Sequence, residues 1–155
     1  MNVSNSNRLA TFEAWLQQYG AILHKIARSY ASPTDRDDLH QDLLIALWEA
    51  LPYYRSESKP QTFIYRVTLN RALNWTRARR PYLELPDLPA PSRDHDRLDQ
   101  LYGAIAQLPE LDRSMILLHL DGLTYAEIAQ VLGLSETNIG ARLTRLRQRL
   151  KETLS

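Results

Sequence analysis

The chain has 155 residues, which allows one domain or two small ones, each with a core of modest size. It contains no cysteine, which excludes disulfides and thiolate metal sites and is typical of a reducing cytoplasm. No apolar run is long enough to cross a bilayer, and the first residues, MNVSNSNRLATF, lack the basic-then-apolar pattern of a signal peptide. We therefore expect a soluble, intracellular protein without membrane insertion.

The net charge of +1 hides an alternation along the chain. Residues 1–54 carry 4 basic and 6 acidic side chains, and residues 55–80 carry 7 and 1. Residues 81–121 carry 3 basic and 8 acidic side chains, and residues 122–155 carry 5 and 3. This alternation is expected if separate surfaces meet a polyanion and another partner.

Two helices are predicted before the first loop. Apolar residues recur at every third or fourth position across residues 12–30, which predicts one helix, or two broken near Gly20, ended by Pro33. Residues 35–51 predict a second helix. The apolar face of this second helix consists of Leu39, Leu43, Leu47 and Leu51.

Acidic residues crowd the start of the second helix. Asp35, Asp37 and Asp38 are favourable there because negative charge stabilises the positive end of a helix dipole. Together with His40 and Asp42 they could also suggest a metal site. Nothing elsewhere supplies a matching ligand set, so we expect no metal.

A third helix is predicted over residues 61–80, after the polar loop PYYRSESKP at residues 52–60. One side of this helix is apolar, and the opposite stripe carries an aromatic ring, two amides and two guanidiniums. Such groups suit a nucleic acid, because arginines hold phosphates, amides read base edges and rings stack on exposed bases. The alternative is a solvated helix face whose aromatic ring packs beneath the tyrosine loop. The stripe consists of Phe63, Arg66, Asn70, Asn74 and Arg77.

A proline-rich segment divides the chain. Residues 81–91, PYLELPDLPAP, hold four prolines and predict an extended linker rather than a helix or central strand. The fold class is therefore all-α, with two small helical domains at residues 8–80 and 94–153 joined by a linker at residues 81–93. The second domain begins with a helix near Asp94, followed by a helix that Pro109 opens and Asp121 closes.

The last part of the chain, residues 124–149, predicts two helices joined by a tight turn. Thr124 and Glu127 form a capping box at the start of the first helix. Gly133 suits the left-handed end of that helix, and Ser135 caps a second helix that begins at about Glu136.

This second helix has one apolar face and one polar face, as in a helix-turn-helix whose recognition helix enters the major groove. An ordinary helical hairpin with a solvated basic face is the alternative. The apolar stripe consists of Ile139, Leu143, Leu146 and Leu150. The polar side includes Thr137, Asn138, Ala141, Thr144, Arg145 and Gln148.

Three blocks occur in an order and spacing that resemble an ECF-class sigma factor of bacterial RNA polymerase. They are DRDDLHQDLLIALW at residues 35–48, TFIYRVTLNRALNW at residues 62–75, and LPELDRSMILLHLDGLTYAEIAQVLGLSETNIGARLTRLRQRL at residues 108–150. The resemblance implies a cytoplasmic transcription initiation factor without a cofactor, which performs no bond chemistry itself. The implied partners are core RNA polymerase, promoter DNA and an anti-sigma factor.

The resemblance also implies a role for each segment. The first block would dock on the clamp of the polymerase's largest subunit, through Asp38, Leu39, Gln41, Asp42 and Trp48. The loop and third helix would open the minus-ten element and hold a flipped base, through Tyr53, Tyr54, Arg55, Phe63, Arg66, Asn70, Asn74 and Arg77. The helix-turn-helix would rest on the flap of the second-largest subunit and read the minus-thirty-five element, through Thr137, Asn138, Ala141, Arg142, Thr144, Arg145 and Gln148.

The chain departs from the family pattern at several positions. Phe63 stands where the family usually has tryptophan, and Gly140 and Ala141 stand where basic and hydroxylated residues are usual. Neither Gly140 nor Ala141 offers a side-chain hydrogen bond to a base. Our hypothesis is that upstream reading moves to DNA shape or to Thr137, Asn138, Thr144 and Arg145.

Two other functions compete with this one. A stand-alone helix-turn-helix regulator would bind duplex DNA as a dimer without polymerase, although no spare apolar dimerisation helix is visible. An enzyme acting on nucleic acid through the acids of residues 35–42 would need a metal and would lose turnover when Asp38 and Asp42 are replaced.

Overall fold

The computed structural model describes residues 5–79 and 97–154, and within them the chain is helical without strands, as predicted. The predicted linker at residues 81–93 and the expected helix start near Asp94 lie outside the described residues. The first group of elements is α1 (Asn5–Tyr30), α2 (Arg36–Ala50), the short 3₁₀ turn η1 (Leu51–Tyr53) and α3 (Pro60–Arg79).

The first three helices pack around leucines that the sequence placed on one face of α2. Leu39, Leu43, Leu47 and Leu51 are all buried, which confirms the predicted stripe. The helix α1 continues through Gly20 without a break. The sequence left one or two helices open, and the structure has one.

The second group of elements is α4 (Arg97–Ala106), α5 (Glu110–Leu120), α6 (Tyr125–Leu132) and α7 (Glu136–Leu154). The predicted capping box is present, because the Glu127 amide donates to the Thr124 hydroxyl at 3.2 Å and the Thr124 amide donates to the Glu127 carboxylate at 3.0 Å. Gly133 ends α6 with a left-handed φ of 71°. The turn that orients α7 is therefore encoded locally, and the α7 stripe of Ile139, Leu143, Leu146 and Leu150 is buried as predicted.

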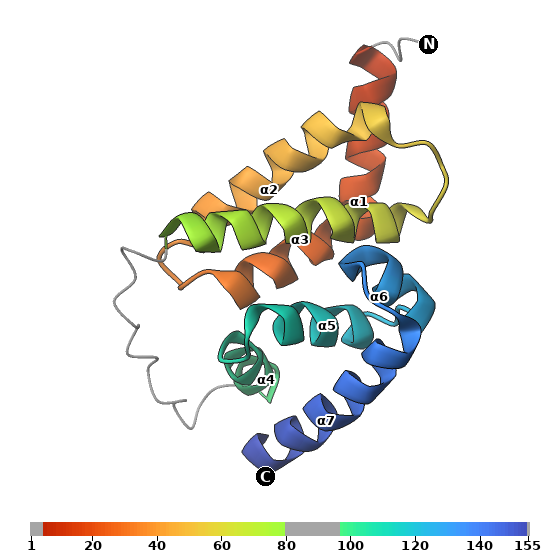
Figure 1. The fold of residues 1–155 in the computed structure, drawn as a ribbon. Coiled ribbons are helices and arrows are strands. Elements are labelled where there is room, and N and C mark those ends of the chain that lie inside the picture. Colours follow the sequence, from red (N-terminus) through yellow and green to blue (C-terminus); the bar gives the residue numbers. More distant parts are fainter. Residues whose placement is uncertain (1–4, 80–96, 155) are drawn as a thin grey trace.

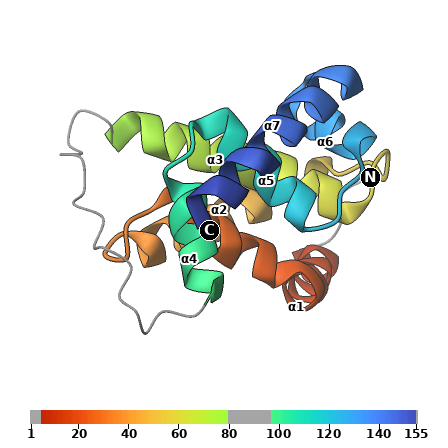
Figure 2. The same cartoon turned by 90° about the horizontal axis from the view of Figure 1, so that it is seen from below.

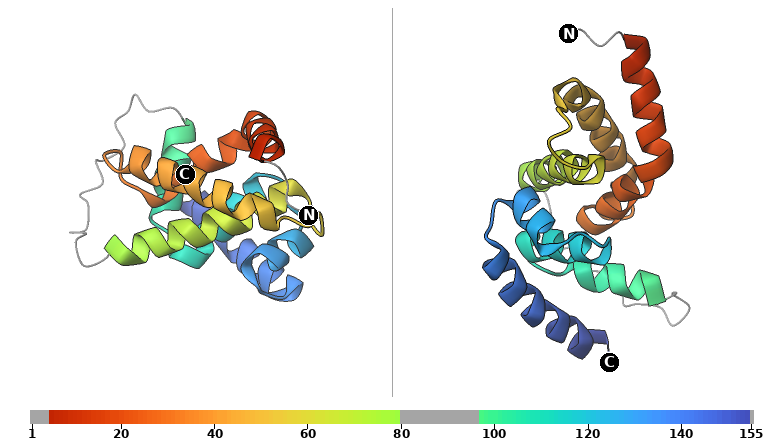
Figure 3. Two further views of the ribbon diagram at one scale, coloured as in Figure 1. Left: turned by 90° about the horizontal axis from the view of Figure 1, so that it is seen from above. Right: turned by 90° about the vertical axis from the view of Figure 1, so that its right-hand side faces the viewer.

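The two groups of helices pack directly against each other. Figures 1 and 2 show α5 lying between α7 and the layer formed by α1, α2 and α3, and contacts join α3 to α5 and α6 and α1 to α4 and α5. The buried apolar residues of both groups form one contiguous cluster. In the right-hand view of Figure 3, α7 runs along the outer edge of the molecule. No helix of the described residues has the length and apolar character that a membrane span requires.

Candidate nucleic-acid and protein interfaces

The predicted polymerase-docking residues divide into exposed and buried groups on α2. Asp38 and Gln41 are exposed, whereas Leu39 has no exposed surface and lies in the core. At 0% exposure the Leu39 side chain packs the helix, and its direct contact with polymerase stays a prediction. Ile45 is 51% exposed, and it follows Gln41 by one helical turn.

Asp42 and Trp48 are both partly occupied by contacts within the first group of helices. The Arg71 guanidinium of α3 donates to the Asp42 carboxylate at 2.9 Å. The Trp48 ring meets the Phe12 ring edge-on with centroids 5.3 Å apart, and the Arg8 guanidinium lies over the same ring at 4.0 Å. These two residues therefore join α2 to its neighbours as well as bordering its exposed face.

The tyrosine loop and the start of α3 enclose a cluster of aromatic rings. Phe63 lies with its centroid 5.0 Å from Tyr54 and 6.0 Å from Trp15, and it is only half-buried. This is the packing beneath the loop that the sequence left open as an alternative to base stacking. Tyr53 is 79% exposed and Arg55 is also exposed, so the loop still presents one ring and one cation to solvent.

The loop itself is held in a defined conformation. The Tyr54 hydroxyl donates to the Ser58 carbonyl at 2.6 Å, which closes the loop on itself. Ser56 has a φ of 59°, a left-handed conformation that is unusual for a residue other than glycine. The loop therefore keeps a strained backbone at its tip.

The rest of the α3 stripe faces solvent, as predicted. Asn70 and Asn74 are exposed, and Arg66 is half-buried. Asn70 and Asn74 border a shallow hollow between α2 and α3, which is also lined by Ala46, Glu49, Ala50, Val67 and Arg71. A base placed in this hollow would meet two amides, a small apolar surface and two charged side chains, and amides beside an apolar surface are the kind of contact that holds an unstacked base.

Two polar residues of α7, Asn138 and Arg142, make contacts within the fold. The Ser135 hydroxyl accepts a hydrogen bond from the Asn138 amide at 3.2 Å and so caps the helix. The Asn138 side-chain oxygen accepts from Arg142 at 2.9 Å, and Arg142 also lies 3.8 Å from the Asp112 carboxylate. Two of the predicted upstream readers, Asn138 and Arg142, are therefore engaged with each other and with α5.

The remaining α7 candidates are exposed: Thr137, Ala141, Thr144, Arg145 and Gln148. The Thr144 hydroxyl donates to the Gly140 carbonyl at 2.9 Å, and the Gln148 amide donates to Glu152 at 3.3 Å. Gly140 faces the Tyr125 ring, and a methyl group added there would lie 3.5 Å from it, an ordinary contact.

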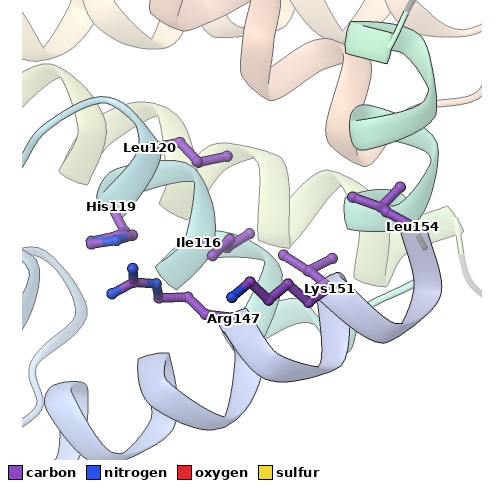
Figure 4. Close-up of a pocket in the computed structure, with 7 residues that line it drawn as sticks. Ile116, His119, Leu120, Arg147, Lys151 and Leu154 are labelled. Carbon is purple, nitrogen blue, oxygen red and sulfur yellow. The ribbon is translucent and has the colours of Figure 1, made fainter.

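An apolar groove that the sequence did not reveal lies on the other side of α7. It has a volume of about 470 Å³ and runs between α5 and the end of α7. Leu120 and Leu154 are 53% and 45% exposed beside it. Figure 4 shows the nitrogen ends of His119, Arg147 and Lys151 on one side of this groove, away from Leu154. The sequence could not reveal this groove, because it forms only where α5 packs against the end of α7.

Asp35, which precedes α2, and His40 within it make contacts inside the fold. The Asp35 carboxylate accepts from the Ser32 hydroxyl at 3.2 Å and lies 3.4 Å from Arg79. His40 stacks on His24 of α1 with centroids 4.2 Å apart. Within residues 5–79 and 97–154, no three His, Cys, Asp or Glu side chains gather in a way that could hold a metal ion.

Comparison with known proteins places both halves of the chain in one family. Residues 15–82 match the model of Sigma-70 region 2, and residues 98–150 match that of Sigma-70, region 4. RNA polymerase sigma factor NccH of Alcaligenes xylosoxydans xylosoxydans is 31% identical over 160 residues, covering 92% of this chain and 86% of the relative.

Two solved structures share the fold over nearly the whole chain. One is CnrH in complex with the cytosolic domain of CnrY, with a TM-score of 0.69 and 27% identity, covering 94% of this chain and 88% of that one. The other is the sigma factor RpoE in complex with the anti-sigma factor NepR from Bartonella quintana, with a TM-score of 0.76 and 23% identity, covering 93% and 96%.

Proposed function

Because this chain belongs to the ECF sigma factors of bacterial RNA polymerase, we propose that three of its surfaces bind the polymerase clamp, the minus-ten element and the minus-thirty-five element. The chain is a sigma factor, which binds core RNA polymerase and directs promoter-specific transcription initiation. The observation that best supports this assignment of surfaces is that α3 and α7, the two helices proposed to meet DNA, expose polar stripes while their opposite faces are buried.

The exposed stripe of α2 is our candidate for the clamp contact. Gln41, Ile45 and Glu49 follow one another by single turns, and Asp38 lies on the same side. An exposed isoleucine among polar neighbours is typical of a protein contact with an apolar centre and a polar rim. Leu39 and Trp48 would hold this stripe in place from behind.

The tyrosine loop and the exposed part of α3 are our candidates for minus-ten opening. Unstacking a base costs a few kcal/mol, and stacking or pocket contacts return about 1–3 kcal/mol per base. Tyr53 offers an exposed ring, and Asn70 and Asn74 border a hollow between α2 and α3. We propose Asn70 and Asn74 for base contacts and Arg66 and Arg77 for phosphate contacts. Phe63 would support Tyr54 rather than stack on a base.

The outer side of α7 is our candidate for the minus-thirty-five element. Thr137, Thr144 and Arg145 are exposed and project from the helix that follows the tight turn. Gln148 extends the same surface by one turn. Asn138 and Arg142 would have to exchange their mutual hydrogen bond for contacts with DNA.

The groove between α5 and α7 is our candidate for the flap contact. Its apolar floor suits a leucine-rich segment, and its basic rim suits acidic residues beside that segment. Because the groove and Arg145 lie on different sides of α7, this domain could hold the flap and upstream DNA together.

Three further properties complete the proposal. The chain would catalyse no reaction itself, since nucleotide addition belongs to core polymerase. It would act in the cytoplasm, where core polymerase and promoter DNA meet. An anti-sigma factor would control it, by analogy with the similar sigma factor RpoE, which was solved in complex with the anti-sigma factor NepR.

Run-off transcription with bacterial core polymerase tests this proposal. The purified chain should bind core polymerase and produce a transcript from its promoter, with no transcript when either protein is omitted. Tight promoter binding without polymerase and a symmetric footprint would instead support a stand-alone regulator. Absence of both core binding and transcript from every promoter tested would refute the proposed function.

A further inference from the structure

Arg71 of α3 lines the same hollow as Asn70 and Asn74, although it lies outside the stripe that the sequence singled out. It follows Asn70 directly and precedes Asn74 by three residues, and positions three apart are neighbours on a helix surface. Its side chain is 39% exposed, so a ligand in the hollow can reach it. The wall of the hollow therefore combines two amides and a guanidinium from a single helix.

The Arg71 guanidinium is held within the fold through its Nε atom alone. This Nε donates to the Asp42 carboxylate at 2.9 Å, and Asp42 belongs to α2, which packs alongside α3 (Figure 1). The two terminal nitrogens of Arg71 have no hydrogen-bond partner among residues 5–79 and 97–154. Since a guanidinium carries five N–H donors in a planar fork, most of its donors remain available to a ligand.

The ion pair between Arg71 and Asp42 fixes an orientation more than it stabilises the fold. The two side chains are 39% and 31% exposed, and ion pairs that solvent reaches to this extent contribute little to stability. The hydrogen bond at Nε nevertheless restricts the guanidinium plane, which reduces the entropy lost when the terminal nitrogens bind an acceptor. A binding residue whose rotamer is fixed by a second side chain is the arrangement that a preorganised site requires.

The charges around the hollow favour an anion on its α3 side. The helix α3 carries Arg66, Arg71, Arg77 and Arg79 and no acid. On the α2 side the hollow is lined by Glu49, whose carboxylate would repel a phosphate but can accept a hydrogen bond from an exocyclic amino group of a base. A nucleotide in the hollow would therefore keep its phosphate beside Arg71.

We propose that Arg71 binds a phosphate of the melted promoter strand, beside the base that Asn70 and Asn74 contact, and that Asp42 positions Arg71 for this contact. This inference rests on the proposed function and adds to it one DNA-binding residue and one positioning residue. Asp42 would then act within the chain, through Arg71, rather than by touching the polymerase clamp, the role that the family resemblance implies for it. Asp38, four residues earlier on α2, is exposed and stays a candidate for the clamp.

The salt dependence of promoter opening tests the phosphate contact. Open complex would be measured by permanganate reactivity at several salt concentrations, with the full chain, core polymerase and promoter DNA. Arg71→Gln should form about tenfold less open complex, because it loses a hydrogen bond to a charged group. The slope of log affinity against log salt should fall in magnitude by about 1, the change expected for one phosphate contact. Both effects should be equal on promoters with different minus-ten sequences, since phosphates carry no sequence information.

Two further arginine variants serve as controls for charge. Lysine keeps a point charge without the planar fork, so Arg71→Lys should keep most of the salt slope and lose only part of the affinity. Arg97→Gln removes an exposed arginine from α4, outside the proposed interfaces, and should leave the amount of open complex and its salt slope unchanged.

A double-mutant cycle tests the positioning role of Asp42. Asp42→Asn should reduce open complex about threefold in the parent and have no further effect in Arg71→Gln, because the side chain that it positions is then absent. The affinity of Asp42→Asn for core polymerase, measured without DNA, should equal that of the parent. Asp38→Asn is the contrasting variant on the same helix, since the loss of this exposed carboxylate should weaken core binding.

The outcomes separate this inference from the proposed function. Circular dichroism would establish that each variant is folded, and Arg71→Lys replaces Arg71→Gln in the cycle if the latter does not fold. An unchanged salt slope in Arg71→Gln, or a loss confined to some minus-ten sequences, would overturn the phosphate contact. Weaker core binding in Asp42→Asn, undiminished in the Arg71→Gln background, would overturn the positioning role. A parent that neither binds core polymerase nor opens any promoter would refute the proposed function, whereas variants that match a fully active parent would refute this inference alone.

Discussion

The two helices proposed to meet DNA, α3 and α7, present their polar groups in different ways. On α3 the exposed amides of Asn70 and Asn74 border a hollow. On α7 the side-chain oxygen of Asn138 accepts a hydrogen bond from Arg142, and the Thr144 hydroxyl donates to the Gly140 carbonyl of the same helix. A ligand that binds Asn138 or Thr144 must replace these hydrogen bonds, whereas a ligand can meet the α3 amides without displacing bonds of this kind. The comparison predicts that replacing the α3 amides reduces open-complex formation by a larger factor than replacing any single α7 residue reduces upstream-element binding.

The largest effect is expected from Asn70→Ala combined with Asn74→Ala. Each amide contact with a base is worth about 1–3 kcal/mol, so the double variant should form about a hundredfold less open complex. Permanganate reactivity of unpaired thymines measures the amount of open complex, and binding to core polymerase should not change. Gln17→Ala with Gln18→Ala, which removes two exposed amides from α1, is the control. Loss of core binding in the asparagine variant would contradict the assignment.

A smaller effect is expected from Arg145→Ala on α7. Loss of one arginine contact should weaken upstream-element binding about tenfold, measured by footprinting with core polymerase. Arg97→Ala is the control, because Arg97 is an exposed arginine of α4 that lies outside the surfaces proposed to bind DNA or polymerase. An unchanged upstream footprint in Arg145→Ala would show that α7 reads DNA through other residues or through shape.

The Asp121 carboxylate accepts hydrogen bonds from Lys25 of α1 and Tyr65 of α3, and this contact between the two groups of helices should respond to acid. Since the pKa of Asp121 is lowered in the fold, despite the opposing effect of burial, its stabilisation is complete above the ordinary aspartate pKa of about 3.9. It is then lost as the pH falls through the lower, folded value. Thermal unfolding of the parent and of Asp121→Asn, compared from pH 7 to pH 3, should show a stability difference that shrinks in acid. A difference independent of pH would exclude the carboxylate charge as its source.

The smallest effect is expected from Gly140→Ala, at the position where α7 lacks a side chain. Alanine favours a helix interior over glycine by about 1 kcal/mol, and the added methyl group would lie at ordinary contact distance from Tyr125. The free energy of unfolding should therefore rise by about 0.5–1 kcal/mol, measured by denaturant titration. A fall in stability would mean that the Tyr125 ring cannot accommodate the methyl group.

Features set by neighbours in sequence could be predicted, and they are confirmed. Thr124 and Glu127 are three residues apart, and Gly133 adopts a left-handed conformation because it ends α6 at the tight turn. The buried stripe from Ile139 to Leu150 follows from helical periodicity alone. The family blocks identified the function for the same reason, since each lies within one continuous segment.

Features that depend on packing between segments could not be predicted. Phe63 carries the same sequence signal whether it stacks on a base or packs beneath Tyr54, and its contact with Trp15 of α1 could not be predicted from its own helix. The sequence predicted Asp121 only as the end of a helix and did not pair it with Tyr65. Their hydrogen bond joins positions 56 residues apart, across a proline-rich segment that predicted separate domains.

The closed conformation of the tyrosine loop has a consequence for the entropy of promoter opening. Fixing the backbone of a flexible residue costs about 1–2 kcal/mol, and a loop that became ordered only on meeting DNA would lose this amount at each of its residues. Here the Tyr54–Ser58 hydrogen bond and the ring cluster hold the loop in one shape before DNA arrives. The ordering has already occurred during folding, so the exposed Tyr53 ring is presented to the melted strand by a preorganised surface.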